Sequence, residues 1–429
     1  MTTNDYIALE DRYGAHNYHP LPVVLSEGRG VYVYDVDGKQ YFDFLSAYSA
    51  VNQGHCHPRI VAVMQQQART LTLTSRAFHN DQLGPYEQYL SAYFGFDKVL
   101  PMNTGAEAVE TAIKLCRKWG YEVKGIPTDR ARIIVCGQNF HGRTTTIISF
   151  SSDPNARGNF GPYTPGFESI PYGDSEALRT ALANDPATIA GVLVEPIQGE
   201  AGVFVPADDY IPAVAAACRK HNVLFIADEI QTGIGRTGAL LRVCGDCSCA
   251  GHCERQPDTY TRPDVLILGK ALSGGTYPVS AVLADDAVMH VIRPGQHGST
   301  FGGNPVACAV AREALEVIVD EKLTQNARRL GHLFRERMQA LVEAHPDKLV
   351  LVRGKGLLNA LVINDGEDSD TAWNLCLALA DHGLLAKPTH GNIIRFAPPL
   401  VISEAELSEA CDIIAAAVAA VPAATAASQ

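Results

Sequence analysis

The spacing of hydrophobic residues predicts a sheet of buried strands, separated by helices, in the middle of the chain. Four short runs are continuously apolar, as is typical of strands covered on both faces: Ile133–Cys136, Gly191–Val194, Val223–Ala227 and Val265–Leu268. Elsewhere apolar residues recur at helical spacing, which predicts helices over Ala106–Trp119, Ser175–Ala183 and Tyr210–His221. Strands that alternate with helices in this way predict an α/β fold, with a mostly parallel sheet covered by helices on both sides.

The two ends of the chain follow a different pattern. Near the N-terminus, Val31–Asp35 and Gln40–Phe44 alternate apolar and polar residues around Asp37-Gly38, which is typical of a β-hairpin. The C-terminal third predicts long helices, short strands and a closing helix: Val306–Val319, Leu323–Ala344, Leu349–Arg353, Leu357–Val362, Ile393–Phe396 and Glu404–Ala420. This mixture is of the α+β type.

These patterns predict a division of the chain into three parts. Residues 1–49 form an N-terminal segment whose hairpin packs with a small domain, and residues 50–305 form the large domain. Residues 306–429 form the C-terminal small domain. A chain of 429 residues suits two such domains, because α/β domains often exceed the average domain length of about 150 residues.

Composition and charge exclude several classes of partner. The chain has 35 Lys and Arg against 47 Asp and Glu, a net charge of −12 without a basic block, which argues against binding to nucleic acid or anionic membranes. The apolar stretch Ile413–Ala427 is rich in alanine and interrupted by Pro422, so it is a poor membrane span. The acidic residues Asp5, Glu10 and Asp11 do not suit a signal or transit peptide, so we expect a cytoplasmic protein.

Candidate chemistry lies at the ends of the predicted strands. In open α/β sheets ligands bind at the carboxyl ends of the strands. Asp228 ends the third predicted strand, Lys270 follows the fourth, and Phe140 and Arg143 follow the first. Thr104 precedes a helix at a glycine. Each is ordinary when taken alone, since such a lysine is usually a surface residue and such an aspartate or threonine a helix cap.

Together these residues match the needs of pyridoxal phosphate. That cofactor needs a lysine for its aldehyde, a carboxylate that keeps its ring nitrogen protonated, and a helix start for its phosphate. Lys270, Asp228 and Thr104-Gly105 offer these three parts. Partial burial of the lysine would lower its pKa and favour the neutral amine.

Longer strings of sequence carry a family resemblance. From about Tyr13 to Leu400 the chain resembles the class III, pyridoxal-phosphate-dependent aminotransferases of fold type I, most specifically in Phe42–His55, Val194–Gly202 and Leu268–Gly275. Within this class it resembles the ornithine δ-aminotransferase family. The resemblance implies transfer of the δ-amino group of L-ornithine to 2-oxoglutarate, giving glutamate 5-semialdehyde and L-glutamate. The route it implies is ping-pong, through the pyridoxal and pyridoxamine forms of the cofactor.

The resemblance assigns the residues around the cofactor ring. Lys270 is the implied covalent lysine and the base that moves a proton between substrate and cofactor. Asp228 is implied to pair with the ring nitrogen, and Gln231 to hydrogen-bond the ring hydroxyl. Phe140 and Ile230 are implied to pack on the two ring faces.

A second group is implied to bind the phosphate. Gly105 and Ala106, after Thr104, would donate backbone N–H groups to it. Ser299 and Thr300 would reach the phosphate of the neighbouring subunit's cofactor. The resemblance therefore implies a homodimer whose active sites are shared between subunits.

The implied substrate residues form a third group. Arg143 would bind the α-carboxylate of ornithine, Tyr18 its α-amino group, and Tyr48 lies near the same pocket. Arg395 would bind a carboxylate of 2-oxoglutarate and glutamate, and Glu200 would mask it while ornithine is bound. An ordinary structural salt bridge is the alternative interpretation of the Glu200–Arg395 pair.

A cysteine-rich insertion at residues 243–256 departs from the family pattern. The thiols of Cys244, Cys247, Cys249 and Cys253, with His252 nearby, resemble metal ligands in spacing. All of them lie on one short segment, whereas structural zinc sites usually draw ligand pairs from separate segments. Three interpretations stay open: a surface insertion, a dithiol that responds to a thioredoxin-type partner, and a bound metal.

Two other functions remain as alternatives. An ω-aminotransferase for N-acetylornithine or 4-aminobutyrate would share Lys270, Asp228 and an arginine anchor, and would differ at positions such as Tyr18 and Tyr48. A metal-binding or redox-docking module with a vestigial catalytic site is the alternative of another class. The complete set of cofactor residues argues against that module.

Overall fold

The central part of the chain forms a twisted seven-stranded sheet. The computed structural model describes residues 1–246 and 261–422, and within them this sheet has the strand order β4-β10-β9-β8-β7-β5-β6. Its strands are β4 (Lys98–Met102), β5 (Arg132–Cys136), β6 (Phe167–Ile170), β7 (Ile189–Val194), β8 (Leu224–Asp228), β9 (Val265–Leu268) and β10 (Ser280–Ala284). The strands from β9 to β6 pair in parallel, and β10 is antiparallel to both of its neighbours. The predicted mostly parallel sheet is confirmed.

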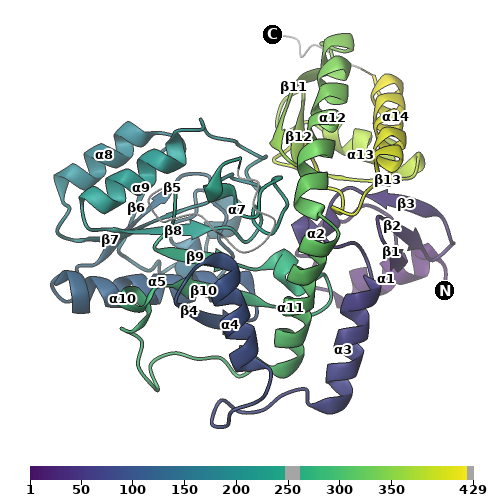
Figure 1. The fold of residues 1–429 in the computed structure, drawn as a ribbon. Coiled ribbons are helices and arrows are strands. Elements are labelled where there is room, and N and C mark those ends of the chain that lie inside the picture. The colour runs from purple at the N-terminus through teal and green to yellow at the C-terminus, as the bar shows by residue number, and fades with distance from the viewer. Residues whose placement is uncertain (247–260, 423–429) are drawn as a thin grey trace.

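Helices cover both faces of this sheet (Figure 1). In β5, Ile133 and Val135 point into one hydrophobic cluster, and Ile134 and Cys136 point into another on the opposite face. Helix α5 (Gly105–Trp119) covers the first face, and α8 (Ser175–Asn184) and α9 (Tyr210–Lys220) cover the second. Burial on both faces explains why these strands are continuously apolar in sequence.

The N-terminal segment and the C-terminal third together form two further sheets. In the described part of the chain these are four-stranded, with the orders β1-β2-β3-β13 and β11-β12-β15-β14. Their strands are β1 (Leu25–Arg29), β2 (Tyr32–Asp35), β3 (Gln40–Asp43), β11 (Leu349–Lys355), β12 (Leu358–Ile363), β13 (Leu384–Leu385), β14 (Lys387–Thr389) and β15 (Ile393–Phe396). The predicted hairpin is confirmed as the antiparallel pair β2–β3. Strand β13 pairs in parallel with β3, so the N-terminal hairpin joins the C-terminal third.

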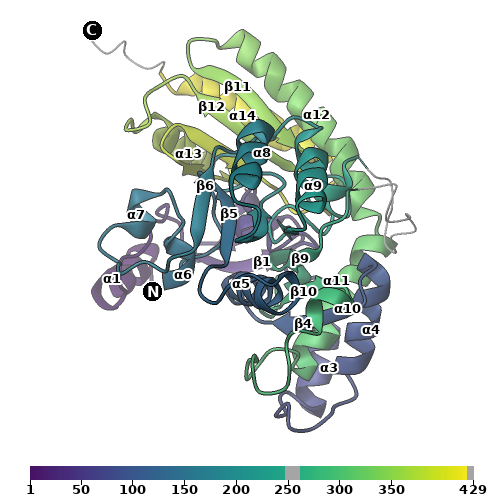
Figure 2. The same cartoon turned by 90° about the vertical axis from the view of Figure 1, so that its left-hand side faces the viewer.

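Long helices connect and flank these sheets. They are α1 (Thr3–Tyr13), α3 (Pro58–Thr70), α4 (Leu83–Phe94), α11 (Pro305–Asp320), α12 (Leu323–Ala344), α13 (Thr371–Asp381) and α14 (Glu404–Ala420). Figure 2 shows α12, α13 and α14 grouped with β11 and β12 at one end of the molecule, beyond the large sheet. Across residues 1–246 and 261–422, none of the helices has the length and apolar character needed to cross a bilayer.

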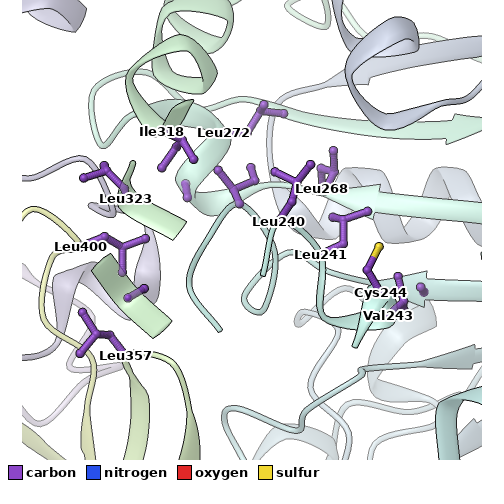
Figure 3. Close-up of a cluster of buried hydrophobic side chains, with 14 of the residues drawn as sticks. Leu240, Leu241, Val243, Cys244, Leu268, Leu272, Ile318, Leu323, Leu357 and Leu400 are labelled. Carbon is purple, nitrogen blue, oxygen red and sulfur yellow. The ribbon is translucent and has the colours of Figure 1, made fainter. Parts of the chain in front are cut away.

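The large sheet and the C-terminal part share one continuous hydrophobic core. Leu268 at the end of β9 and Leu272 in the short helix η4 (Lys270–Ser273) belong to the same buried cluster as Ile318, Leu357 and Leu400 (Figure 3). These residues come from the end of the large sheet, from α11 and from the C-terminal third. The strand ends that carry the candidate site are therefore held against the C-terminal part of the molecule.

A buried arginine reinforces this junction. Arg236 is fully buried and lies after β8; it donates hydrogen bonds to the carbonyl oxygens of Leu357 (2.9 Å) and Pro398 (2.6 Å) and to Asn52 Oδ1 (2.5 Å). Leu357 N–H in turn donates to Arg236 O (3.1 Å). Burial lowers the pKa of this guanidinium to about 9. The hydrogen bonds that it donates offset part of the free-energy cost of removing the charged group from water.

Candidate active site

A cavity of about 200 Å³ opens where the carboxyl ends of the parallel strands meet the start of α5. Most of the predicted cofactor residues line it, together with Glu200: Gly105, Ala106, Phe140, Asp228, Ile230, Gln231 and Lys270. With Glu200, they come from five segments that are far apart in sequence. The strand order brings them together, because parallel strands place their carboxyl ends at the same edge of the sheet.

Lys270 is held at the end of β9 in an uncommon backbone conformation. It begins η4 with a φ of 43°, in the left-handed region that non-glycine residues seldom adopt. Burial lowers the pKa of its amine, although the nearby carboxylate of Glu200 acts in the opposite direction. A lowered pKa raises the fraction of neutral amine, which is the form that attacks a carbonyl carbon.

Asp228 has a partner that the sequence did not predict. His141 Nδ1 lies 2.6 Å from Asp228 Oδ2, and both side chains are buried. Asp228 Oδ1 accepts a hydrogen bond from Ile230 N–H (3.1 Å). Burial opposes protonation of His141, but the Asp228 carboxylate outweighs it and raises the pKa of the imidazole. The histidine therefore orients the aspartate.

Glu195 is a second site residue that sequence reasoning did not single out. It lines the cavity, and its Oε1 accepts a hydrogen bond from Phe140 N–H at 2.9 Å. Burial raises the pKa of this carboxyl to about 7, although His141 acts in the other direction. Through this bond Glu195 fixes the backbone that carries the Phe140 ring and the adjacent His141. The signal available in sequence was its position at the end of β7.

The start of α5 forms an anion-binding end of the cavity. Thr104 caps this 15-residue helix, because its side chain accepts from Glu107 N–H while the Glu107 side chain accepts from Thr104 N–H. Gly105 and Ala106 are the first residues of the helix, so their N–H groups have no partner within it. A Cβ at Gly105 would lie 3.1 Å from Ile230 Cδ1, so the start of the helix leaves little room for a side chain at this position. A phosphate group suits such a helix start.

These features fit pyridoxal phosphate. The cavity offers a partly buried lysine with a lowered pKa, a buried carboxylate held by a histidine, and a helix start with unpaired N–H groups. The cofactor's aldehyde, ring nitrogen and phosphate need these three parts. The aromatic ring of Phe140 and the aliphatic side chain of Ile230 line the same space.

Ser299 and Thr300 lie near the phosphate end without lining the cavity. Asn103 Nδ2 donates a hydrogen bond to Ser299 Oγ (2.8 Å), which places Ser299 beside the start of α5 in its own chain. Thr300 is exposed. Their predicted reach to the cofactor of a neighbouring subunit stays a prediction.

Glu200 and Arg395 form the ion pair that the sequence predicts. Arg395 Nη1 lies 2.9 Å from Glu200 Oε1, and the arginine is buried. Burial alone would raise the pKa of Glu200, but Arg395 and Lys270 lower it below its usual value. The Arg395 guanidinium also lies 5.1 Å from the centre of the Tyr48 ring. Gln231 Nε2 donates to Tyr48 O at 3.2 Å and to Glu200 Oε1 at 3.4 Å.

The two residues predicted to bind the ends of ornithine lie at the exposed edge of the site. Arg143 is exposed, with its guanidinium 5.8 Å from the centre of the Phe140 ring. Tyr18 is 66% exposed. Both act electrostatically on Tyr48, whose hydroxyl pKa is raised by burial first and by Glu200 second. Tyr48 therefore lies within electrostatic range of the other predicted substrate residues, on the side of the cavity where Glu200 and Arg395 meet.

The first two residues of the cysteine-rich insertion, Val243 and Cys244, are buried. Cys244 and Val243 pack in the hydrophobic cluster of Figure 3, beside Leu241. Cys247, Cys249, His252 and Cys253 lie outside the described residues. Within residues 1–246 and 261–422, no group of three or more His, Cys, Asp and Glu side chains is arranged to hold a metal ion. The three interpretations of this segment stay predictions.

Comparison with known proteins points to the same chemistry as the site. The model of the family "Aminotransferase class-III" matches residues 13–418. The mitochondrial ornithine aminotransferase of Drosophila melanogaster is 58% identical over 407 residues, which are 95% of this chain and 90% of that protein.

Solved structures are similar over nearly the whole chain as well. The ornithine aminotransferase of Toxoplasma gondii, crystallised with oxidised glutathione and holding pyridoxal phosphate at partial occupancy, has a TM-score of 0.92 and 48% identity, covering 98% of this chain and 95% of its own. The acetylornithine aminotransferase of Elizabethkingia anophelis has a TM-score of 0.88 and 60% identity, covering 97% and 99%. The match over nearly the whole chain, with the assembled lysine, aspartate and helix start, leads to one conclusion: this protein belongs to the class III aminotransferase family.

Proposed function

We propose that this protein is a pyridoxal-phosphate-dependent ornithine δ-aminotransferase. It moves the δ-amino group of L-ornithine to 2-oxoglutarate and produces glutamate 5-semialdehyde and L-glutamate. The observation that carries this proposal is the Glu200–Arg395 ion pair, closed at 2.9 Å on the border of the cavity that contains Lys270. A distal-amine donor needs such a masked arginine, because an open one would hold the α-carboxylate of ornithine at the reacting end. The names of the relatives from Drosophila and Toxoplasma support the same activity.

The residues that line the cavity have distinct roles in this proposal. Pyridoxal phosphate, when bound, supplies an aldehyde that takes up the amino group and a ring that draws electrons from the reacting carbon. Lys270 Nζ holds the cofactor and moves the proton at the reacting carbon. Asp228, oriented by His141, holds the proton on the ring nitrogen. Gln231 binds the ring hydroxyl, and Phe140 and Ile230 enclose the ring and exclude water.

A second set of residues binds the phosphate and joins two subunits. Thr104 caps α5, and Gly105 and Ala106 bind the phosphate through their N–H groups. Ser299 and Thr300 serve the neighbouring subunit, which makes the functional unit a homodimer. Large apolar side chains that are exposed in the single chain support an interface of this kind; they include Phe78, 70% exposed, and Phe301, 47% exposed. Sedimentation of the purified protein would measure the oligomeric state.

Substrate selection in this proposal depends on the residues around Tyr48. Arg143 binds the α-carboxylate of ornithine and Tyr18 its α-amino group, so that the δ-amine points to the cofactor. When glutamate or 2-oxoglutarate replaces ornithine, Glu200 leaves Arg395, which then binds the carboxylate next to the reacting carbon. The ion pair therefore lets one cavity accept two donors of different shape.

An ω-aminotransferase for N-acetylornithine or 4-aminobutyrate is the second candidate, because a similar solved structure is an acetylornithine aminotransferase. Comparing kcat/KM for L-ornithine, N-acetylornithine and 4-aminobutyrate, each with 2-oxoglutarate, separates the candidates. We expect L-ornithine to be preferred by about tenfold or more, and Tyr18→Phe to reduce that preference, because the tyrosine hydroxyl would contact the free α-amino group. A preference for either of the other donors would contradict the proposal.

Replacing Glu200 should change the preference between donors. In Glu200→Gln the charge that masks Arg395 is lost. Ornithine can then bind with its α-carboxylate on Arg395, which places its α-amine instead of its δ-amine at the cofactor. We expect kcat/KM for L-ornithine to fall by about tenfold relative to that for L-glutamate, the usual scale for one charged hydrogen bond. Glu176→Gln breaks an exposed pair with Arg179 and serves as the control. An unchanged ratio would indicate that Glu200–Arg395 is only a structural salt bridge.

Three wider features belong to the same proposal. We propose the division into residues 1–49, 50–305 and 306–429, with the N-terminal segment packed on the small domain.

We propose a cytoplasmic location, which cell fractionation tests; the Drosophila relative is named as mitochondrial. A thioredoxin-type partner for the cysteine-rich segment would be ruled out by equal activity and subunit association with oxidised and reduced thioredoxin.

A further inference from the structure

The segment that carries Tyr48 has a strained backbone. Residues Ser46, Ala47, Tyr48 and Ser49 have φ values of 48°, 45°, 59° and 74°, so four successive non-glycine residues are left-handed. The turn, labelled α2 (Ser46–Ser49), is closed by hydrogen bonds from Tyr48 N–H to Leu45 O (3.0 Å) and from Ala50 N–H to Ser46 O (2.9 Å). Non-glycine residues seldom adopt the left-handed region even singly, and a run of them is costly and persists only where its surroundings hold it.

The serine hydroxyls of the turn do not hold it. Ser46 Oγ and Ser49 Oγ are buried and have no hydrogen-bond partner among the described residues. The turn is instead capped by Asp43, the last residue of β3. Asp43 Oδ1 accepts hydrogen bonds from Leu45 N–H (2.9 Å) and Ser46 N–H (2.8 Å), the two groups that enter the left-handed run.

Asp43 is itself held by His55. His55 Nε2 lies 2.7 Å from Asp43 Oδ2, and Asp43 is 8% exposed. The backbone of His55 is fixed by two hydrogen bonds with Gly30, at 2.8 and 3.0 Å. Its ring is also closely packed, because a Cβ on Gly28 would lie 3.0 Å from it. Both oxygens of the carboxylate are therefore occupied, one by the turn and one by a rigid partner.

The left-handed turn places Tyr48 between Gln231 and Arg395 in the active site. Its carbonyl oxygen accepts from Gln231 Nε2 at 3.2 Å, and its ring lies 5.1 Å from the Arg395 guanidinium. Arg395 in turn holds Glu200. A change in the backbone at residues 46–49 would therefore move the ring that packs on Arg395 and the acceptor that orients Gln231.

We propose that Asp43, together with His55, is a positioning residue for donor selection. By holding the left-handed turn, it keeps Tyr48 against Arg395 and stabilises the closed Glu200–Arg395 pair. It thereby favours donors whose reacting amine is far from their α-carboxylate. This inference rests on the proposed function for the identity of the donors, but the hold of Asp43 on the turn does not.

The first test measures the turn without any substrate. In Asp43→Ala, hydrogen exchange of the backbone amides in residues 44–51 should become faster, while the rest of the sheet keeps its protection. Asp43→Asn keeps an oxygen that can accept from Leu45 and Ser46, so it should stay close to wild type. Unchanged exchange in Asp43→Ala would overturn the proposal, whatever the protein acts on.

The second test measures selectivity. Asp43→Ala should lower kcat/KM for L-ornithine by about tenfold relative to L-glutamate, and Asp43→Asn should restore the ratio to within about twofold of wild type. Combining Asp43→Ala with Tyr48→Ala should shift the ratio no further than Tyr48→Ala alone, because both changes act through one ring. Equal losses with both substrates, or shifts that simply add, would overturn the positioning role.

A matched pair at an exposed position checks the backbone directly. The Ala47 side chain is exposed, so its replacement removes no buried contact. Ala47→Val places a β-branched residue at a φ of 45° and should mimic Asp43→Ala, whereas Ala47→Gly tolerates that φ and should keep the wild-type ratio. A larger change of the ratio in Ala47→Gly than in Ala47→Val would overturn the proposal. A wild type that does not use L-ornithine would instead reject the proposed function, and the exchange experiment would still decide whether Asp43 holds the turn.

Discussion

Replacing Lys270 with alanine should lower kcat/KM for L-ornithine by at least about 10⁴-fold, the largest effect we expect from any single change. The Lys270 amine lines the cavity at the end of β9 and can act there both as nucleophile and as base. Its lowered pKa supplies the neutral form that the chemistry requires. Steady-state kinetics with 2-oxoglutarate as acceptor would measure the loss.

The same variant should keep its fold. Lys118→Ala removes a lysine that pairs with Glu122 on the surface of α5, and it should retain wild-type activity and serve as the control. Mass spectrometry after borohydride reduction should find the cofactor on the peptide that contains Lys270 in wild type and on no peptide in Lys270→Ala. Retained activity, or attachment at another lysine, would remove Lys270 from its role.

Replacing Asp228 with asparagine should lower kcat by about 10³-fold. An amide cannot hold the proton on the ring nitrogen as an ionised carboxylate does, so the ring would draw electrons less strongly. The substitution nearly preserves the volume of this buried side chain, and it should lower the pKa of His141, because the carboxylate that raises it is gone.

Two measurements separate this electrostatic effect from misfolding. The melting temperature of Asp228→Asn should stay close to that of wild type, and nuclear magnetic resonance titration of His141 should show the lower pKa. Asp185→Asn, which breaks a surface pair with Arg132, is the matched control. A variant that keeps more than about a tenth of the wild-type kcat would contradict the role proposed for Asp228.

The elements that could be predicted from sequence are those with strong local patterns. The continuous apolar runs of β5, β7, β8 and β9 required burial on both faces, and the structure confirms it. Strands β4, β6 and β10 were not predicted. Strands β4 and β6 lie at the two edges of the sheet and are less uniformly apolar, whereas β10 lies inside the sheet and was missed although it is buried. Strand β4 even contains Pro101, which is tolerated at an edge but argues against a central strand.

The residues of the site also divide into those that could be predicted from sequence and those that could not. Lys270 and Asp228 could be found because each ends a recognisable strand, and parallel strands share one edge. His141 and Glu195 act through contacts with residues 87 and 55 positions away, which no local pattern displays. Asp43 was missed for another reason: its role depends on left-handed backbone in Ser46–Ser49, where neither glycine nor asparagine marks such a conformation in the sequence.

The direct test of the account is to follow the nitrogen atom. Purified protein would be supplied with 2-oxoglutarate and with L-ornithine that carries nitrogen-15 at either the δ or the α position. We predict that label from the δ position appears in L-glutamate, that label from the α position stays in the product semialdehyde, and that Lys270→Ala transfers neither. Transfer of the α label, or of no label by the wild-type protein, would contradict the account.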